Sequence, residues 1–311
     1  MITATTMLYL YVETPLHAGT GSGLSSIDLP IQRERTTQYP MIQGSGIKGK
    51  LRATAEDAID ETDKEKKREQ EAIISVIFGP SSKQGEASDH AGALIAGDAR
   101  ILLFPVRSLN GVFAYTTSYD VLSRFKRDVE RGSKEQRLSW DVPTPISDTA
   151  LVTITSDVQA NDMIVLEDFS IETKQDSGVD DIAEWLASYA LPDLGAGNYW
   201  ANKIRSSLVI LPNDNFRDFV LYATEVITRV RIDREKKTVA KGALWTEEHL
   251  PTDTLLYVPI YATNARNNGS KMSGEDVLAA VKPLGTGKGS YLQLGGDETV
   301  GRGIVRIRWG D

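Results

Sequence analysis

Two residues that could take part in catalysis, His17 and Asp28, lie at opposite ends of the Gly/Ser-rich stretch HAGTGSGLSSID. A carboxylate surrounded by phosphate-binding groups can bind a divalent metal ion or orient a 2′-hydroxyl. A histidine beside it can transfer protons near neutral pH. Gln32 and Arg33 follow soon after, so a polar and basic run lies next to the acid. A structural histidine and a solvated aspartate remain open as the plainer alternatives.

A second group of polar residues is found in GALWTEEHLP, which contains Glu247, Glu248 and His249. A solvated turn is the plainer interpretation, and the spacing alone does not decide. The chain has no Cys and three His. Disulfides, a structural zinc site and thiol nucleophiles are therefore excluded, and we expect oxygen ligands for any metal ion.

A third group is the stretch GSGIKGKLR, residues 44–52, which nearly matches the phosphate-binding loop of nucleotide hydrolases. Leu51 stands where that loop needs a Ser or Thr hydroxyl for Mg²⁺, which argues against ATP. An anion site remains, since a Gly-rich helix start presents backbone amides to phosphate. Its candidate phosphate-binding residues are Gly44, Ser45, Lys48, Lys50 and Arg52. A second Gly-rich segment, QLGGDETVGRGIVRIRW, brings Arg302 as a further cation.

Length and charge limit the kind of protein. The 311 residues are enough to bury a core, and the net charge is −8. That charge is local: residues 157–184 hold nine acids and the single Lys174, so the remainder is neutral overall and compatible with a polyanion partner. No apolar run of about 18 residues and no signal peptide are seen. We therefore expect a cytoplasmic protein without a membrane partner.

Periodicity predicts the elements that must position these groups. Strands are expected at 3–13, at 93–106 as one strand or a pair, and at 206–212, 224–233, 255–263 and 303–309. Helices are expected from Ser45 to Ile59 and at 71–79, 118–132, 180–190 and 213–223, the last one capped by Asn or Asp. Two alternating runs around the charged turn DREKK predict a hairpin with Arg229 and Arg231 on one face. Interleaved helices and strands favour an α+β fold.

Several of these stretches together resemble one family. HAGTG, IDLPIQRE, YPMIQGSGIKGKLR and the carboxyl-terminal Gly-rich segment resemble the RAMP superfamily of CRISPR proteins. IDLPIQRE, EVITRVRID, GALWTEEHLP and LGGDETVGRG are similar to the repeated, target-cleaving backbone subunit of type III-B (Cmr) complexes.

The resemblance implies one RAMP domain over residues 1–311, with a modified RNA-recognition (ferredoxin-like) fold, insertions and a β-hairpin "thumb" at about 224–250. It implies copies stacked along a guide (CRISPR) RNA, other Cmr subunits, and an endoribonuclease that cuts a target RNA at regular intervals. Asp28 would be essential, as a base or as a ligand of Mg²⁺ or Mn²⁺. His17 would lie near the scissile bond. Glu247 would be a supporting acid in the cleavage reaction, supplied by the thumb of a neighbouring copy.

The chain departs from the family at His249, where Tyr is usual, so the role of this residue as an orienting or proton-transfer group is an open prediction. With this family in view, contacts to RNA are expected from the anion site (Gly44, Ser45, Lys48, Lys50 and Arg52) and from Gln32, Arg33, Arg229 and Arg302. Two other functions remain as alternatives. One is a non-catalytic RNA-binding filament subunit, and the other is an ATP-dependent enzyme, against which Leu51 argues.

Overall fold

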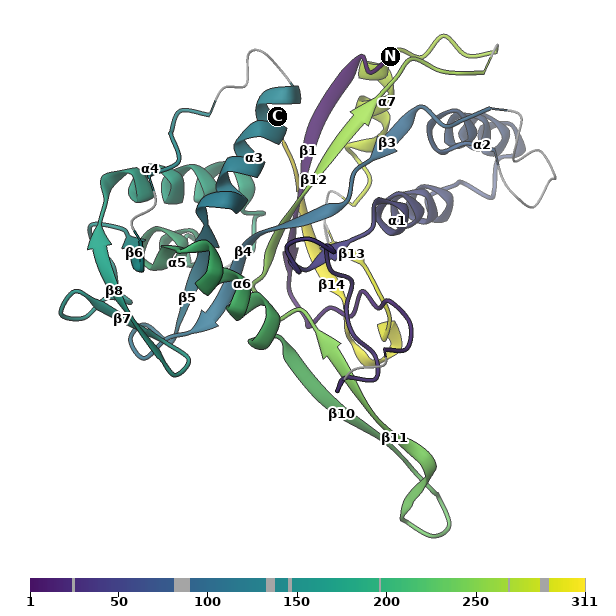
Figure 1. The fold of residues 1–311 in the computed structure, drawn as a ribbon. Coiled ribbons are helices and arrows are strands. Elements are labelled where there is room, and N and C mark those ends of the chain that lie inside the picture. The colour runs from purple at the N-terminus through teal and green to yellow at the C-terminus, as the bar shows by residue number, and fades with distance from the viewer. Residues whose placement is uncertain are drawn as a thin grey trace.

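A mixed β-sheet runs through the body of the molecule, and a two-stranded hairpin projects away from it (Figure 1). The computed structural model describes residues 1–23, 26–80, 90–132, 138–144, 147–195, 197–267, 269–285 and 291–310. Along the sheet the order is β13 (Tyr291–Gln293), β14 (Ile304–Trp309), β1 (Ala4–Val12), β12 (Leu255–Ala262), β4 (Ala99–Arg107), β5 (Phe113–Ser118), β9 (Leu208–Leu211), β6 (Thr149–Val152), β8 (Phe169–Gln175) and β7 (Met163–Leu166). Two short strands lie off this path, β2 (Met41–Ile42) on β4 and β3 (Leu94–Ala96) on β12.

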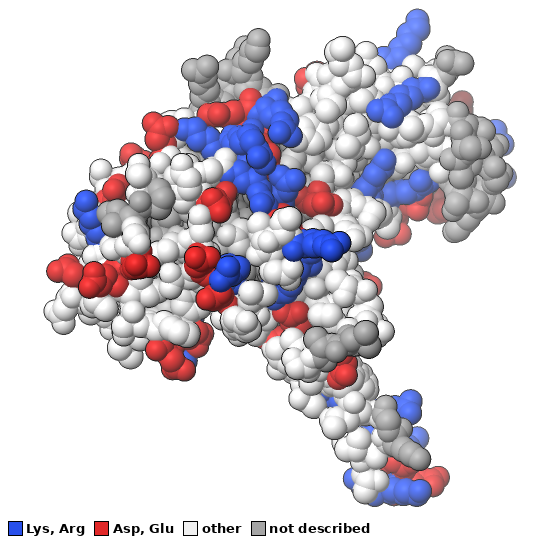
Figure 2. Space-filling model, in the orientation of Figure 1, with Lys and Arg blue, Asp and Glu red and all other residues white. Residues whose placement is uncertain are grey.

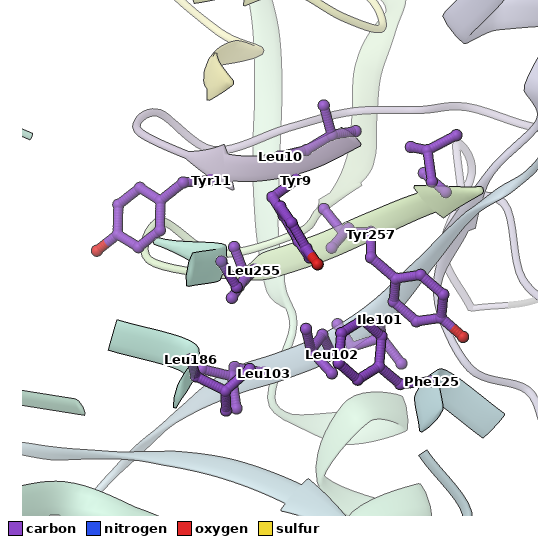
Figure 3. Packing of buried hydrophobic residues seen from close by; sticks show 14 of the residues in the cluster. Tyr9, Leu10, Tyr11, Ile101, Leu102, Leu103, Phe125, Leu186, Leu255 and Tyr257 are labelled. Atoms are coloured by element: carbon purple, nitrogen blue, oxygen red, sulfur yellow. The ribbon is translucent and has the colours of Figure 1, made fainter. Parts of the chain in front are cut away.

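The predicted strand at the amino end, β1, is central. It pairs antiparallel with β12 on one side and with β14 on the other. Leu8, Leu10 and Val12 are fully buried, because a strand covered on both faces is apolar along its length rather than alternating. Tyr9 and Tyr257 both make edge contacts with Phe125, and Figure 3 shows these rings between the sheet strands and the helix that carries Phe125. The predicted β1 strand is confirmed.

Helices pack around this sheet. They are α1 (Gly44–Asp57), α2 (Lys64–Phe78), α3 (Tyr119–Gly132), α4 (Ser177–Trp185) with a π-helical continuation (Leu186–Ala190), α5 (Tyr199–Ser207), α6 (Asn213–Tyr222), α7 (Gly274–Val281) and a 3₁₀ turn (Glu298–Val300). Helix α1 buries Ile47 and Leu51 completely. Leu51 is therefore a core residue at the position where a nucleotide hydrolase would carry a hydroxyl.

The predicted helices are present, with differences in detail. The charged stretch before residue 71 and the apolar run after it form one continuous helix, α2, which Asp63 caps by accepting from the amides of Glu65 and Lys66. Helix α6 has Pro212 at its N-cap and no side-chain cap, so the predicted Asn or Asp cap is wrong. Strands β6, β7 and β8 and helix α5 were not predicted. These three strands lengthen the sheet beyond β9.

The predicted hairpin is confirmed. It consists of β10 (Glu225–Ile232) and β11 (Val239–His249), which pair antiparallel and leave the body at the lower right of Figure 1. Its outer half is exposed, including Val230 and Ile232 on one face. Its base, around Glu247 to His249, is buried against the body. The hairpin is thus an arm whose root belongs to the core.

Charged residues gather at several places on the surface. Figure 2 shows acids on the side formed by β7 and β8 and a group of Lys and Arg over α3, while at the hairpin tip Lys and Arg lie beside acids. None of the nine acids between residues 157 and 184 is buried, as a solvated acidic segment requires. In the described part of the chain no helix is long and apolar enough to cross a membrane.

Candidate active site at the base of the hairpin

The root of β11 lies between two segments that are distant in sequence. On one side Leu29 donates its amide to Thr246 O (3.0 Å) and accepts from the amide of Glu248 (3.0 Å). On the other side lies the glycine-rich loop, the segment between Leu294 and Gly303. Because side chains alternate along a strand, Thr246 and Glu248 project from one face of β11 and Glu247 and His249 from the other. The site therefore has two halves.

The first half holds Asp28. Its Oδ2 accepts from the amide of Thr246 (2.8 Å) and from Thr246 Oγ1 (3.0 Å), and its own amide donates back to Thr246 Oγ1 (3.0 Å). The residue is exposed to solvent. A carboxylate held by two donors has a defined direction while its free oxygen and remaining lone pairs face water. Asp28 is thus anchored to the hairpin of its own chain.

Beside Asp28, Glu248 ties the same segment to the hairpin root. Glu248 is 3% exposed, and its Oε1 accepts from Arg33 Nη2 and Thr224 Oγ1 while its Oε2 accepts from the amide of Ile31. Arg33 also donates to the carbonyl of Val220 (2.8 Å). The Arg33 guanidinium was predicted to contact RNA, but the structure buries it in an internal ion pair. Its observed role is to hold the Asp28 segment.

The second half contains the side chains of Glu247, His249 and Asp297, together with the Arg229 cation. Arg229 donates from Nε to Glu247 Oε2 (2.8 Å) and from Nη2 to Asp297 Oδ2 (3.0 Å). Trp245 Nε1 donates to the other oxygen of Glu247 (2.7 Å). Burial alone would raise the pKa of Glu247, but these hydrogen bonds outweigh it and hold that pKa below its ordinary value. Glu247 is therefore ionised at neutral pH.

His249 lies beside both carboxylates without a hydrogen bond to either. It is fully buried, and neither ring nitrogen has a hydrogen-bond partner among the residues that the structure describes. Its Nε2 is 3.9 Å from Glu247 Oε2 and 3.7 Å from Asp297 Oδ2. Burial, followed by the neighbouring His17 and Arg302, lowers the pKa of His249 below its ordinary value. The ring is therefore neutral at pH 7 and has no surface through which to touch RNA in this conformation.

His17 connects the halves. Its Nδ1 is 2.7 Å from the carbonyl of Glu248, and its ring is 5.4 Å from that of His249. Since a carbonyl only accepts, the neutral ring carries its proton on Nδ1 and leaves Nε2 as an acceptor. The glycine-rich loop closes over its backbone, because Gly296 donates to His17 O (2.9 Å). Gly295 has φ 77°, and a Cβ there would lie 2.2 Å from His17 O.

The structure places the predicted RNA contacts of α1 in internal contacts. Asp98 Oδ1 accepts from the amide of Gly44 (2.8 Å), so a carboxylate of the chain itself occupies the helix start proposed for phosphate. Lys48 donates to the carbonyl of Leu94, and burial lowers its pKa. Arg52 donates to Glu56 and to the carbonyl of Gly79. Ser45 is exposed and Lys50 half-buried. RNA binding by these five residues stays a prediction.

The remaining predicted contacts divide in the same way. Gln32 joins two loops, since its Nε2 donates to the carbonyl of Gly19 and its Oε1 accepts from the amide of Gln43. Arg229 is held by Glu247 and Asp297. Among the described residues, Arg302 has no hydrogen-bond or ion-pair partner for its side chain, and it lies close enough to His249 to affect the pKa of that ring. Arg302 is the most available of these cations.

Sequence reasoning thus identified His17, Glu247 and His249, which the fold brings together, and Asp28, which lies on the opposite face of β11. It missed Thr246 and Asp297. Asp297 is the acid that follows the paired glycines of LGGDETVGRG, and that position was the one available signal. In the described part of the chain, one group of three side chains could hold a metal ion: Glu247, His249 and Asp297, with ligand atoms within 4.8 Å of one another. It includes a nitrogen and excludes Asp28, unlike the predicted all-oxygen site.

Similarity to known proteins defines the class to which this chain belongs. Residues 9–306 match the RAMP superfamily, and the chain belongs to that family. It is 40% identical over 300 residues to the CRISPR system Cmr endoribonuclease Cmr4 of Pyrococcus furiosus, covering 96% of this chain and 93% of the relative. These matches confirm the resemblance inferred from the sequence motifs.

Solved structures agree. The crystal structure of oligomeric Cmr4 from Pyrococcus furiosus is similar with a TM-score of 0.71 and 31% identity, over 99% of this chain and 98% of that one. A type III-B Cmr-beta complex bound to cognate target RNA contains a chain with the same fold, at a TM-score of 0.71 and 22% identity, over 99% and 98% of the two chains. The predicted α+β RAMP fold, related to the RNA-recognition motif, is confirmed.

Proposed function

We propose that this protein is the guide-RNA-binding backbone subunit of a type III-B CRISPR complex and the endoribonuclease that cuts complementary target RNA at regular intervals. Its partners would be guide RNA, target RNA, further copies of itself and other Cmr subunits. The observation that carries the proposal is the exposed Asp28 carboxylate, aimed by Thr246 at the root of a projecting hairpin. Identity of 40% along nearly the whole chain to a Cmr endoribonuclease supports it.

The chemistry suited to such a site is attack of a ribose 2′-hydroxyl on the adjacent phosphorus. In-line geometry is needed, and an A-form duplex resists it, whereas a nucleotide displaced from the duplex can reach it. The hairpin, taken here as a thumb at about residues 224–250 of one RAMP domain, is the element suited to displace a base pair. Asp28 stands at its root and would accept the proton of the 2′-hydroxyl or orient that group.

The other predicted catalytic residues would act around Asp28. His17 offers Nε2 as an acceptor, because its Nδ1 is engaged by the carbonyl of Glu248. Glu247 and His249 are buried, so they would position the hairpin root and the glycine-rich loop in the chain that carries them. A role of Glu247 towards the neighbouring copy would require the hairpin root to open. Arg302, Ser45 and Lys50 are the cations and hydroxyl with most freedom to contact the RNA backbone.

A divalent ion, Mg²⁺ or Mn²⁺, is the cofactor proposed for this reaction. When bound near Asp28 it would neutralise the charge that develops on the phosphate. Asp28 supplies one carboxylate with free lone pairs, which fits an ion that keeps most of its waters and binds RNA oxygens as well. A CRISPR effector meets its target RNA in the cytoplasm, so we place the protein there.

The test is cleavage by the reconstituted complex with guide RNA and an end-labelled complementary target. Asp28→Asn keeps an acceptor for Thr246 but removes the charge. Asp60→Asn is the matched control, because Asp60 Oδ1 likewise accepts from the amide (2.9 Å) and hydroxyl (2.6 Å) of a threonine, Thr62. We expect Asp28→Asn to bind guide RNA normally and to lose at least a hundredfold in cleavage rate, the scale of acid–base catalysis. Asp60→Asn should behave as the wild type.

Evenly spaced products from the wild type, lost in Asp28→Asn alone, would support the proposed activity. Guide binding without any cleavage by the wild-type complex, with and without Mg²⁺ or Mn²⁺, would instead favour the non-catalytic filament subunit. Normal cleavage by Asp28→Asn would end the assignment of Asp28.

A further inference from the structure

The buried half of the site carries more negative charge than its own cation neutralises. The Glu247 residue is 5% exposed, and Asp297 is partly exposed. Both carboxylates accept hydrogen bonds from the single guanidinium of Arg229. Arg302 adds a positive field there, but in the described part of the chain its side chain donates no hydrogen bond. Two carboxylates against one bonded cation leave one formal negative charge at a largely desolvated place. A buried charge of this kind is costly unless something compensates it.

His249 adds a second, independent observation. A fully buried imidazole normally has partners for its nitrogens, and among the described residues Nδ1 and Nε2 have none. The two carboxylates next to Nε2, at 3.7 and 3.9 Å, are too distant for hydrogen bonds. An imidazole nitrogen that faces two carboxylate oxygens has the composition of a metal site.

We propose that Glu247, His249 and Asp297 form a binding site for a divalent transition-metal ion, through Glu247 Oε2, His249 Nε2 and Asp297 Oδ2. Bonds of about 2.0–2.2 Å place neighbouring ligand atoms roughly 3.0–3.4 Å apart, so the observed gaps of 3.7 and 3.9 Å need to close by about 0.3–0.9 Å. Arg229 need not leave, because each carboxylate oxygen can accept from it and bind the ion as well. Arg229 would then orient both carboxylates from outside the metal's ligand shell.

The ligand set indicates which ion. Mg²⁺ prefers oxygen ligands and holds its waters, whereas an imidazole nitrogen suits Zn²⁺, Co²⁺ and related ions, and Mn²⁺ accepts mixed sets. The site differs in place from the Asp28 metal of the proposed function, and its nitrogen ligand favours transition-metal ions over Mg²⁺. It would fasten the glycine-rich loop, through Asp297, to the hairpin root, through Glu247 and His249. Its role is to hold these two elements together beside His17.

Binding of Co²⁺ to the metal-free full-length protein tests the site without RNA. Co²⁺ bound to nitrogen and oxygen ligands absorbs visible light, so a titration reports both affinity and ligand type. The variants are His249→Phe, which keeps a buried ring without a nitrogen, and Asp297→Asn, which keeps the size of the side chain. His90→Phe is the matched control, because His90 lies outside the site and, among the described residues, its Nε2 is within hydrogen-bond distance of the carbonyl of Ser75 (3.1 Å). Asp28→Asn is the second control.

We expect one Co²⁺ per wild-type chain, with the same affinity in His90→Phe and Asp28→Asn and at least a tenfold loss in both His249→Phe and Asp297→Asn. Metal should also raise the unfolding temperature of the wild type and not that of these two variants. Folding of each variant is checked by circular dichroism in metal-free buffer. If only one of the two ligand variants folds, that variant alone is enough to test the site. No saturable binding by the wild type at millimolar Co²⁺, or wild-type affinity in the folded variants, would overturn the proposal. Neither result bears on target cleavage, so failure of this site and failure of the proposed function are distinguishable.

Discussion

The buried ion pair between Arg33 and Glu248 ties the segment that carries Asp28 to the hairpin root. Its side chains are 13% and 4% exposed, so neither charge is screened well by water. Replacing Arg33 by Met leaves a buried carboxylate with two neutral or backbone donors. Breaking a buried pair by removing one partner costs about 3–5 kcal/mol. That is a large part of the roughly 5–15 kcal/mol that stabilises a typical folded domain.

The double variant Arg33→Met with Glu248→Leu separates lost attraction from stranded charge. It removes both charges and leaves the donors of Ile31 and Thr224 without their acceptor. The carbonyls of Val220 and Gln38 lose the Arg33 donor in the single and the double variant alike. Unpaired buried donors cost about 1–3 kcal/mol each at most, and the hydroxyl can turn elsewhere. We therefore expect the double variant to be more stable than Arg33→Met alone, by about 1–2 kcal/mol.

Urea unfolding followed by circular dichroism measures these differences. With a slope of about 2 kcal/mol per molar urea, Arg33→Met should lower the midpoint by roughly 1.5–2.5 M. Arg107→Met is the control, since Arg107 pairs with Glu167 on the surface, and its midpoint should stay near that of the wild type. An Arg33→Met midpoint equal to that of the control, or a double variant no more stable than the single one, would refute the reasoning.

Two further predictions concern the segments around the site. Burial alone would raise the pKa of Glu34, but hydrogen bonds from Arg124 and Thr37 outweigh it and lower that pKa below 4.5. The ionised form is thus favoured by folding, and its contribution is present above 4.5 and lost as the pH falls through the folded-state value. Glu34→Gln should cost about 1–3 kcal/mol at pH 7 and much less near pH 3 in urea unfolding, and equal losses at both would contradict this. Gly295→Ala should lower the unfolding temperature more than Gly301→Ala, because both have positive φ but only Gly295 would also press a Cβ against His17 O; similar losses would show that strain alone acts.

Elements with a strong period were predictable from the sequence, and those without one were not. Strand β1 and helices α1 and α3 each carry a buried run or stripe that is long enough to be recognised in the sequence. The hairpin was recognisable from its two alternating strands. Strands β6 and β7 have four residues each, too short for alternation to emerge from the acidic segment around them. The cap of α6 was misjudged because Asn213 lies one residue inside the helix, after Pro212.

The site was predictable in its residues and not in its pairings. Histidine, aspartate and glutamate types could be singled out by chemistry, but the bond between Asp28 and Thr246 spans 218 residues of sequence. The helix start at Gly44 shows the opposite limit. Its composition indicates an anion site, and the anion that occupies it is Asp98. Local sequence cannot tell a phosphate from a carboxylate of the same chain.

Because both halves of the site share β11, movement of the hairpin affects them together. Thr246 and Glu248 hold the Asp28 segment on one face of the strand, while Glu247 and His249 meet the glycine-rich loop on the other. A rotation of the hairpin about its root would turn the carboxylate of Asp28 and at the same time change the distances from His249 to its two acids. The exposed outer half of the hairpin is the part that a bound RNA duplex could push. If the hairpin inserts into a duplex as proposed, that insertion would change the orientation of the Asp28 carboxylate through the same strand.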